Sequence, residues 1–338
     1  MPTSSKSFGA RFKKRYKAFL ERRPHRSFRL TRRRDYVRPL ELPGNIAFTH
    51  EVNRTLWGYR KTFLLLAVVY ALLYGLLVGV QSQDTFTVLS ESLGQVGPEI
   101  SGGEWGALEQ AGGLLLTIAT AGIGTEMTEV QQIFSVFVFL LVWLTTVWLL
   151  RNLLAGHKVK LRDGLYSAGA PIFALIMIVL LIAVQLIPVA IAAIGYSAAL
   201  SSGLLVGATA MLFWTAAGLL GVLSLYWITS SLFAAIIITI PGMYPYEAIK
   251  SAGDLVLGRR IKILLRWLWM VLAICVSWLL VLIPVIFLDM GLKALWPAVE
   301  WLPIIPYAIV ILSSCTIVWA SAYVYLLYRK VVEYVPES

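Results

Sequence analysis

The feature that most constrains this chain is a series of long apolar stretches that are almost free of charged residues. A hydrocarbon layer about 30 Å thick is crossed by about 20 residues of α-helix. Transmembrane strands would instead need alternating apolar and polar residues, and that alternation is absent. The sequence therefore predicts an all-α polytopic membrane protein with six transmembrane helices and additional interfacial amphipathic helices. The predicted spans are 62–80, 130–150, 169–194, one within 204–240, 264–288 and 302–328.

Composition agrees with a chain that folds in a bilayer. Hydrophobic residues make up 59% of the 338 positions and charged residues only 14%, whereas soluble domains carry about a quarter charged residues. The two cysteines, Cys275 and Cys315, each lie inside an apolar run, and no Cys-x-x-Cys or Cys/His cluster exists. We therefore predict no disulfide framework, no metal site and no cofactor.

The distribution of charge predicts the orientation. Residues 1–61 hold 17 Lys and Arg against four Asp and Glu, a balance of +13, while the whole chain is +11. Residues 81–129 hold seven acids and no cation, whereas residues 151–163 and 241–266 are rich in Lys and Arg. Because short cytoplasmic loops are enriched in cations, both termini are predicted to lie in the cytoplasm.

Three regions follow from these patterns. Residues 1–41 form a basic cytoplasmic region, residues 42–61 an interfacial elbow helix, and residues 62–338 the six-span membrane domain. In the first region, Phe8, Phe12, Tyr16 and Phe19 share one face of a predicted basic helix, and Arg32, Arg33 and Arg34 follow. This composition suits the anionic inner leaflet. Nucleic acid is a weaker alternative because no RNA-binding motif is present, and a protein partner stays open.

Two segments of the membrane domain are ambiguous in length. The 37 residues of 204–240 are long for one crossing, but the charge pattern favours one tilted helix over two spans. The acidic outer loop 81–129 contains an apolar stretch, Leu114–Ile123, that is too short to span. It is consistent with a re-entrant piece, an interfacial piece or an extension of the next helix.

An internal repeat is predicted over 130–195 and 204–289. Ser-Ala-Gly recurs at 167–169 and 251–253, and Leu-Ile-Pro-Val recurs at 186–189 and 282–285. Both copies would face the same side of the membrane, as a parallel repeat of helix, cytoplasmic helix and helix.

The second cytoplasmic loop carries the candidate contact residues. Residues 245–258 predict an amphipathic helix, with Pro245 at its first position and Gly258 at its end. Arg259, Arg260 and Lys262 follow and would meet lipid headgroups or a protein partner. An interfacial helix that only orients the next span is the plainer interpretation of the same residues.

This loop also resembles a known family. PYEAIKSAGDLVLGRRIKILLR, residues 245–266, is similar to a motif in the membrane domain of bacterial glycerophosphodiester phosphodiesterases and related six-span proteins. The resemblance covers about 160–330 and implies a bacterial cytoplasmic membrane protein. In that family the catalytic activity belongs to a separate soluble barrel. The resemblance therefore implies the membrane part only and transfers no catalytic residue.

The predicted function is that of a non-catalytic scaffold, assembly or accessory module, with a membrane-protein partner or a second copy of the chain. No convergent nucleophile, base or metal-ligand set is evident. Gln185 is the most polar side chain within a span, near Pro188. A Gln packed against a neighbouring helix is one interpretation. The alternative is a path for a lipid or a small neutral solute without ion coupling.

Overall fold

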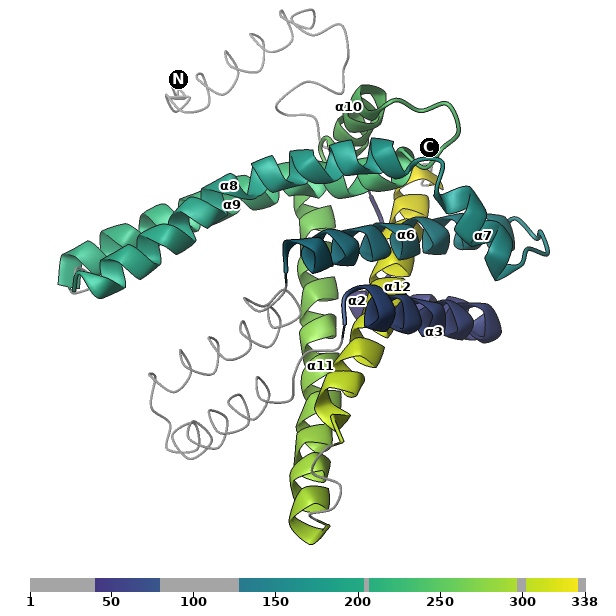
Figure 1. Ribbon diagram of the computed structural model, residues 1–338. Coiled ribbons are helices and arrows are strands. Elements are labelled where there is room, and N and C mark those ends of the chain that lie inside the picture. Colours follow the sequence, from purple (N-terminus) through teal and green to yellow (C-terminus); the bar gives the residue numbers. More distant parts are fainter. Residues whose placement is uncertain (1–39, 80–127, 204–206, 297–301, 334–338) are drawn as a thin grey trace, which may run out of the picture.

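The computed structural model describes residues 40–79, 128–203, 207–296 and 302–333. Throughout these ranges the regular elements are all α-helices, arranged as in Figure 1. Six of the helices are long and apolar enough to cross a membrane. They are α3 (Arg60–Leu77), α6 (Glu129–Leu154), α8 (Ile172–Ser201), α9 (Gly207–Ile237), α11 (Arg260–Leu295) and α12 (Ile304–Glu333), and the shorter helices are α2 (Asn45–Gly58), α7 (Leu161–Ala168) and α10 (Pro245–Val256).

The fold class predicted from the sequence is thus confirmed: the chain is a polytopic helical membrane protein with six candidate spans. Four of the six long helices, α6, α8, α11 and α12, are longer than the predicted spans that identified them. For example, α11 begins at Arg260 and ends at Leu295, beyond both limits of the predicted span 264–288. Residues 207–237 form one continuous helix, as the preference for a single long span within 204–240 required.

Local signals explain several helix limits. The Thr128 side chain accepts a hydrogen bond from the Gln131 amide, and the Gln131 side chain accepts one from the Thr128 amide. This reciprocal capping box satisfies two backbone donors at the start of α6. Pro245 stands at the first position of α10, where the missing amide proton costs nothing. Gly258 has a φ of 76°, a left-handed conformation that ends this segment before α11.

Most of the core lies at one end of the molecule, which we call the charged end. It comprises α7, α10, the last turns of α6, α9 and α12, and the first turns of α11. Buried apolar side chains from these helices form a single cluster there, which also takes in the buried face of α2, the first half of α3 and the start of α8. Tyr323, Phe48 and Phe233 are the largest of its fully buried side chains. The charged end is therefore where the spans are held together.

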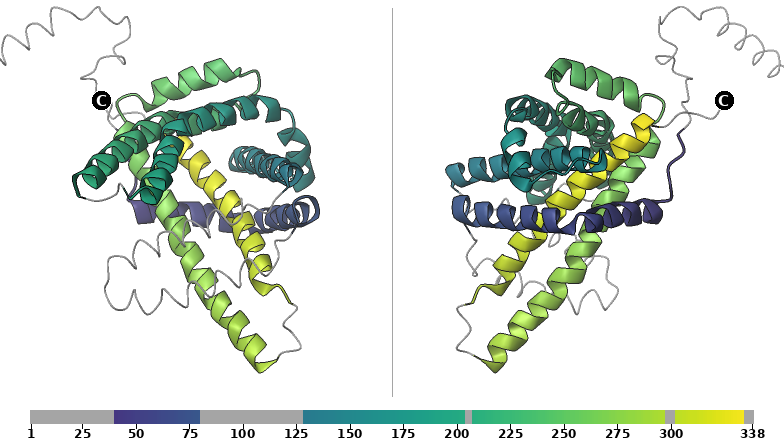
Figure 2. Two further views of the ribbon diagram at one scale, coloured as in Figure 1. Left: turned by 60° about the vertical axis from the view of Figure 1, so that its left-hand side comes forward. Right: turned by 90° about the vertical axis from the view of Figure 1, so that its right-hand side faces the viewer.

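The helices separate away from the charged end. In Figure 1, α8 and α9 run side by side in one direction while α11 and α12 run in another, and Figure 2 shows the same divergence from two further sides. Of the most apolar window of each span, 56% is buried in α6 but only 11% in α8 and in α11. We call the α8–α9 pair the free arm, because its distal half contacts little beyond itself within the described ranges.

The order of elements agrees with the predicted repeat. The series α6, α7, α8 and the series α9, α10, α11 each consist of a long helix, a short amphipathic helix and a second long helix. The last helix of each series contains a proline, Pro188 in α8 and Pro284 in α11. Duplication of an ancestral unit stays a prediction.

Several predicted features lie outside the described residues. They are the basic helix with Phe8, Phe12, Tyr16 and Phe19, the cations Arg32, Arg33 and Arg34, and the stretch Leu114–Ile123.

Candidate functional site

The cations at the charged end bind backbone carbonyl groups of other elements. Arg151 of α6 donates to the Thr239 carbonyl at 3.0 Å and also to the Thr239 hydroxyl, just past the end of α9. Arg259 donates to the Val331 carbonyl at 3.2 Å, in the last turn of α12. Carbonyls at the C-terminal end of a helix lack intrahelical partners and carry partial negative charge. These arginines therefore cap one helix while belonging to another.

The predicted contact cations differ in how accessible they are. Arg259 is 2% exposed. Arg260 is half-buried, donates to the Tyr226 carbonyl at 2.8 Å and stacks on the Tyr226 ring with 4.0 Å to the centroid. Lys262 is exposed and donates to the Leu40 carbonyl at 2.9 Å. Structural roles account for Arg259, while a headgroup contact stays a prediction for Arg260 and Lys262.

Arg266 belongs to this group, although the predicted contact residues do not include it. It is 8% exposed, donates to the Pro43 carbonyl and lies 5.9 Å from the centroid of the Phe48 ring. The Tyr323 hydroxyl donates to the Arg266 carbonyl at 3.3 Å. The sequence feature that could have identified Arg266 is its position four residues after Lys262, because residues at that spacing share a helix face.

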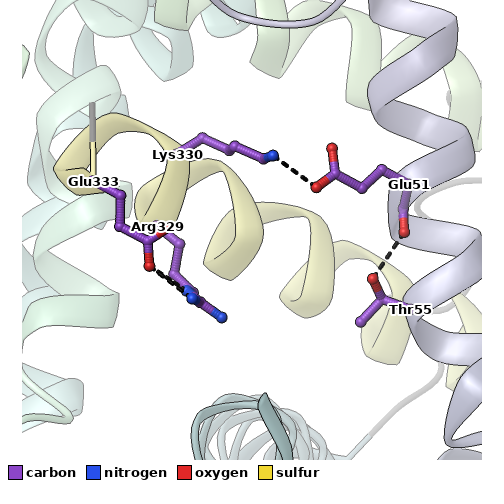
Figure 3. Close-up of polar contacts among 5 residues, drawn as sticks. All are labelled: Glu51, Thr55, Arg329, Lys330 and Glu333. Atoms are coloured by element: carbon purple, nitrogen blue, oxygen red, sulfur yellow. Dashed lines mark hydrogen bonds and ion pairs between the residues drawn. The ribbon is translucent and has the colours of Figure 1, made fainter. Parts of the chain in front are cut away.

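Helix α2 is fixed across α11 and α12 by contacts along its length. The Phe48 ring meets Tyr323 edge-on with 4.8 Å between centroids. Glu51 forms a 2.8 Å ion pair with Lys330 near the end of α12 (Figure 3). The Trp319 indole donates to the Asn53 side chain at 2.7 Å. The predicted elbow segment 42–61 thus packs its apolar face against protein.

Two cavities lie along the crossing of α2 with α11. We call them the basic cavity, of about 740 Å³, and the apolar cavity, of about 610 Å³. The Trp269 indole, which lines the first, donates at 3.0 Å to the hydroxyl of Thr49, which lines the second. The basic cavity is lined by Leu40, Glu41, Leu42, Asn45, Lys262, Leu265, Arg266, Leu268, Trp269 and Leu272.

The apolar cavity lies between α2, α3, α11 and α12. Its walls are mainly aliphatic and aromatic, and its polar groups are spread over α2, the start of α3, α11 and α12. Arg60 is among them and stacks on the Trp57 ring with 5.4 Å to the centroid. Cys315 also lines this cavity, and both it and Cys275 are free thiols.

The intramembrane candidate Gln185 lies within the free arm. It is half-buried, and its side-chain oxygen accepts a 2.8 Å hydrogen bond from the hydroxyl of Ser231, which is 2% exposed. The Gln185 side chain of α8 is therefore joined to α9. This geometry matches the interpretation of Gln185 as a packed side chain that links two helices.

A buried ion pair lies at the opposite end of α11 from the cations. Asp289 is 4% exposed and accepts a 2.7 Å hydrogen bond from Lys293, one turn further along the helix. Nearby, Leu282, Ile286, Ile305 and Ile309 form a small apolar cluster between α11 and α12. Across the described ranges, no three His, Cys, Asp or Glu side chains gather as metal ligands would.

Comparisons of the chain with protein-family models, with curated proteins and with solved structures find no match. The class of the protein is therefore the one that the helices themselves define, a multi-pass helical membrane protein. The resemblance of residues 245–266 to the phosphodiesterase membrane domain stays a prediction.

Proposed function

We propose that this protein is a non-catalytic scaffold, assembly or accessory module of a bacterial cytoplasmic membrane. The observation that carries the proposal is the free arm. Its helices pack against each other, and among the residues that the structure describes the distal half of the pair is anchored to the other spans only through the charged end. A projecting pair of apolar helices offers a long lateral surface to another membrane protein.

The surface of the free arm has the character of a helix-packing face. Gly218 and Gly221 of α9 have no atom within 4 Å of the position that a Cβ would take. Small residues let helix backbones approach closely in lipid, where association depends on packing rather than on the hydrophobic effect. At the distal end, Trp214 lies 5.7 Å from Tyr196 and 5.5 Å from Phe213, measured between ring centroids. These rings join α8 and α9 near their connected ends.

The proposed orientation places the charged end in the cytoplasm, with both termini there. The cations of that end support it, because Lys and Arg are enriched in short cytoplasmic loops. A thiol-labelling experiment checks the orientation. We expect a Ser251→Cys variant to react with an impermeant maleimide only in inverted vesicles. A Ser202→Cys variant, at the end of α8, is expected to react only in intact cells, and the reverse result would contradict the orientation.

The scaffold role is tested by native mass spectrometry and proteomics on protein gently extracted from its own membrane. We expect one reproducible membrane-protein partner or a second copy of the chain. A Gly218→Leu substitution, which fills the open face of α9, is expected to release that partner. The control is Leu76→Phe on α3, a residue that is 81% exposed. Retention of the partner by the Gly218 variant would contradict a role for the free arm.

The apolar cavity supports a second candidate, translocation of a lipid or small neutral solute without ion coupling. About 610 Å³ lined mainly by apolar side chains, with some polar groups, is typical of sites that hold small apolar ligands. Gln185→Leu, which lies on α8 and does not line this cavity, tests a separate path along the free arm. Loss of transport in liposomes with unchanged thermal unfolding would favour translocation, and unchanged transport would exclude Gln185 from the path.

A further inference from the structure

We infer that the basic cavity binds the phosphate headgroup of an anionic phospholipid, with the adjoining face of α11 carrying an acyl chain. The site goes beyond the scaffold role and depends only on the chain lying in a membrane. It commits to one ligand class, a glycerophospholipid with net negative charge.

The cationic part of the site consists of Lys262 and Arg266. They stand one turn apart on α11, so their side chains share a face. Lys262 donates one hydrogen bond, to the Leu40 carbonyl, and an ammonium group has three protons to donate. Arg266 is 8% exposed and lines the cavity, and in the part of the chain that the structure describes its buried Nη1 has no hydrogen-bond partner. Two adjacent positive charges therefore border the cavity, and Lys262 keeps donors for a phosphate group.

The lining of the cavity favours an anion. Its charged side chains are Lys262, Arg266 and Glu41, so two positive charges face one carboxylate. Arginine and lysine are the side chains that bind phosphate oxygens most strongly, through short charge-assisted hydrogen bonds. The buried position of Arg266 raises the cost of leaving its donor unmatched. An anionic group in the cavity would balance the charge of the Arg266 guanidinium group.

The apolar part of the site distinguishes a lipid from a free anion. Leu265, Leu268 and Leu272 line the cavity at spacings of three and four residues and are 57%, 45% and 53% exposed. They form a stripe that leads from the two cations along a membrane-spanning helix. A phospholipid contacts both the cations and the stripe, whereas inorganic phosphate contacts only the cations. Trp269, on the same wall, suits the level of the headgroups.

The other cations of the charged end are less suited to this role. Arg259 is buried and bonded to the end of α12, and Arg260 is stacked on the Tyr226 ring. A volume of about 740 Å³ places the basic cavity within the range of small-molecule sites. Among the described cations of the charged end, those at the start of α11 therefore combine a cavity with an apolar wall.

The experiment is native mass spectrometry of the full-length protein in detergent with added phosphatidylglycerol or phosphatidylcholine of equal acyl chains. We expect phosphatidylglycerol to be retained preferentially. Lys262→Gln should weaken its binding about tenfold, the scale of one hydrogen bond to a charged group. Lys250→Gln removes the same charge from an exposed position on α10 and should leave binding unchanged. Thermal unfolding of each variant verifies that it is folded.

A second variant tests the acyl-chain contact. Leu268→Ser should weaken binding of long-chain phosphatidylglycerol by several fold, since it removes apolar surface from the stripe. Inorganic phosphate and glycerol phosphate at millimolar concentration should not displace the lipid. Equal retention of the two lipids, or equal effects of the Lys262 and Lys250 variants, would overturn the proposal. Displacement by inorganic phosphate would show a site for a free anion and would overturn the lipid assignment.

Discussion

The charged end and the distal end of this molecule use the same kind of helix in different ways. At the charged end, α6, α9, α11 and α12 come together with α7 and α10, apolar side chains interlock, and arginines of one helix bond the terminal carbonyls of another. At the distal end, α8–α9 and α11–α12 stand apart, and most apolar side chains face outward. Apolar exposure is acceptable in lipid, so the protein needs tight packing only where polar groups must be shielded.

This difference predicts that stability is concentrated at the charged end. Tyr323→Ala removes a fully buried ring that packs against Phe48, and should lower the free energy of unfolding by about 3–5 kcal/mol. Trp214→Ala, on the free arm, removes a larger ring that is 58% exposed, and should cost far less. Denaturation of both variants in detergent, followed by circular dichroism, makes the comparison. Equal losses would contradict it.

The ion pair between Asp289 and Lys293 of α11 is an exception, because it lies at the distal end and should still contribute strongly to stability. Lys293→Met leaves the buried Asp289 carboxylate without its partner, and should destabilise the protein by about 3 kcal/mol. The double variant Asp289→Leu, Lys293→Met should recover most of that loss, because no buried charge remains. Thermal unfolding of the single and double variants measures the difference. A double variant as unstable as the single one would mean that packing, not charge, matters here.

The contact between α7 and α6 provides a smaller effect. A Cβ at Gly164 would lie 3.1 Å from Leu149 and 3.3 Å from Thr145, whereas a Cβ at Gly253 of α10 meets nothing within 4 Å. Gly164→Val should therefore destabilise the protein by about 1–3 kcal/mol through overpacking. Gly253→Val is the matched control, since it makes the same change in a short helix where the added side chain meets no neighbouring atom. Indistinguishable melting temperatures would show that α7 can shift freely.

The ion pair between α2 and α12 should have the smallest effect. Glu51 and Lys330 are each about 40% exposed, so solvent screens their attraction. A double-mutant cycle with Glu51→Gln and Lys330→Gln should give a coupling of about 0.2–1 kcal/mol that decreases as salt is added. A coupling above this range would mean that α2 shields the pair more than its exposure indicates.

Local features of this protein could be predicted from the sequence, whereas contacts between distant segments could not. Pro245 and Gly258 predicted the limits of the amphipathic helix between two spans, because their backbone restrictions act locally. Gln185 was recognised as exceptional, but its partner Ser231 was not, since a hydrogen bond between helices depends on their register. Arg266 was counted only as one more cation of its loop. Its burial depends on the Pro43 segment, which is more than 200 residues away in the chain.

The sequence alone determined the helical class, the number of spans and the end at which the cations gather. Each of these follows from the free-energy cost of placing unpaired backbone groups and charges in hydrocarbon. That cost depends on the residues of each segment and not on how the segments pack. Only the tertiary structure decided that α2 packs across α11 and α12, that two cavities lie at that crossing, and that the α8–α9 pair stands free. Lipid and protein offer an apolar side chain similar surroundings, so the composition of a span does not specify its neighbours.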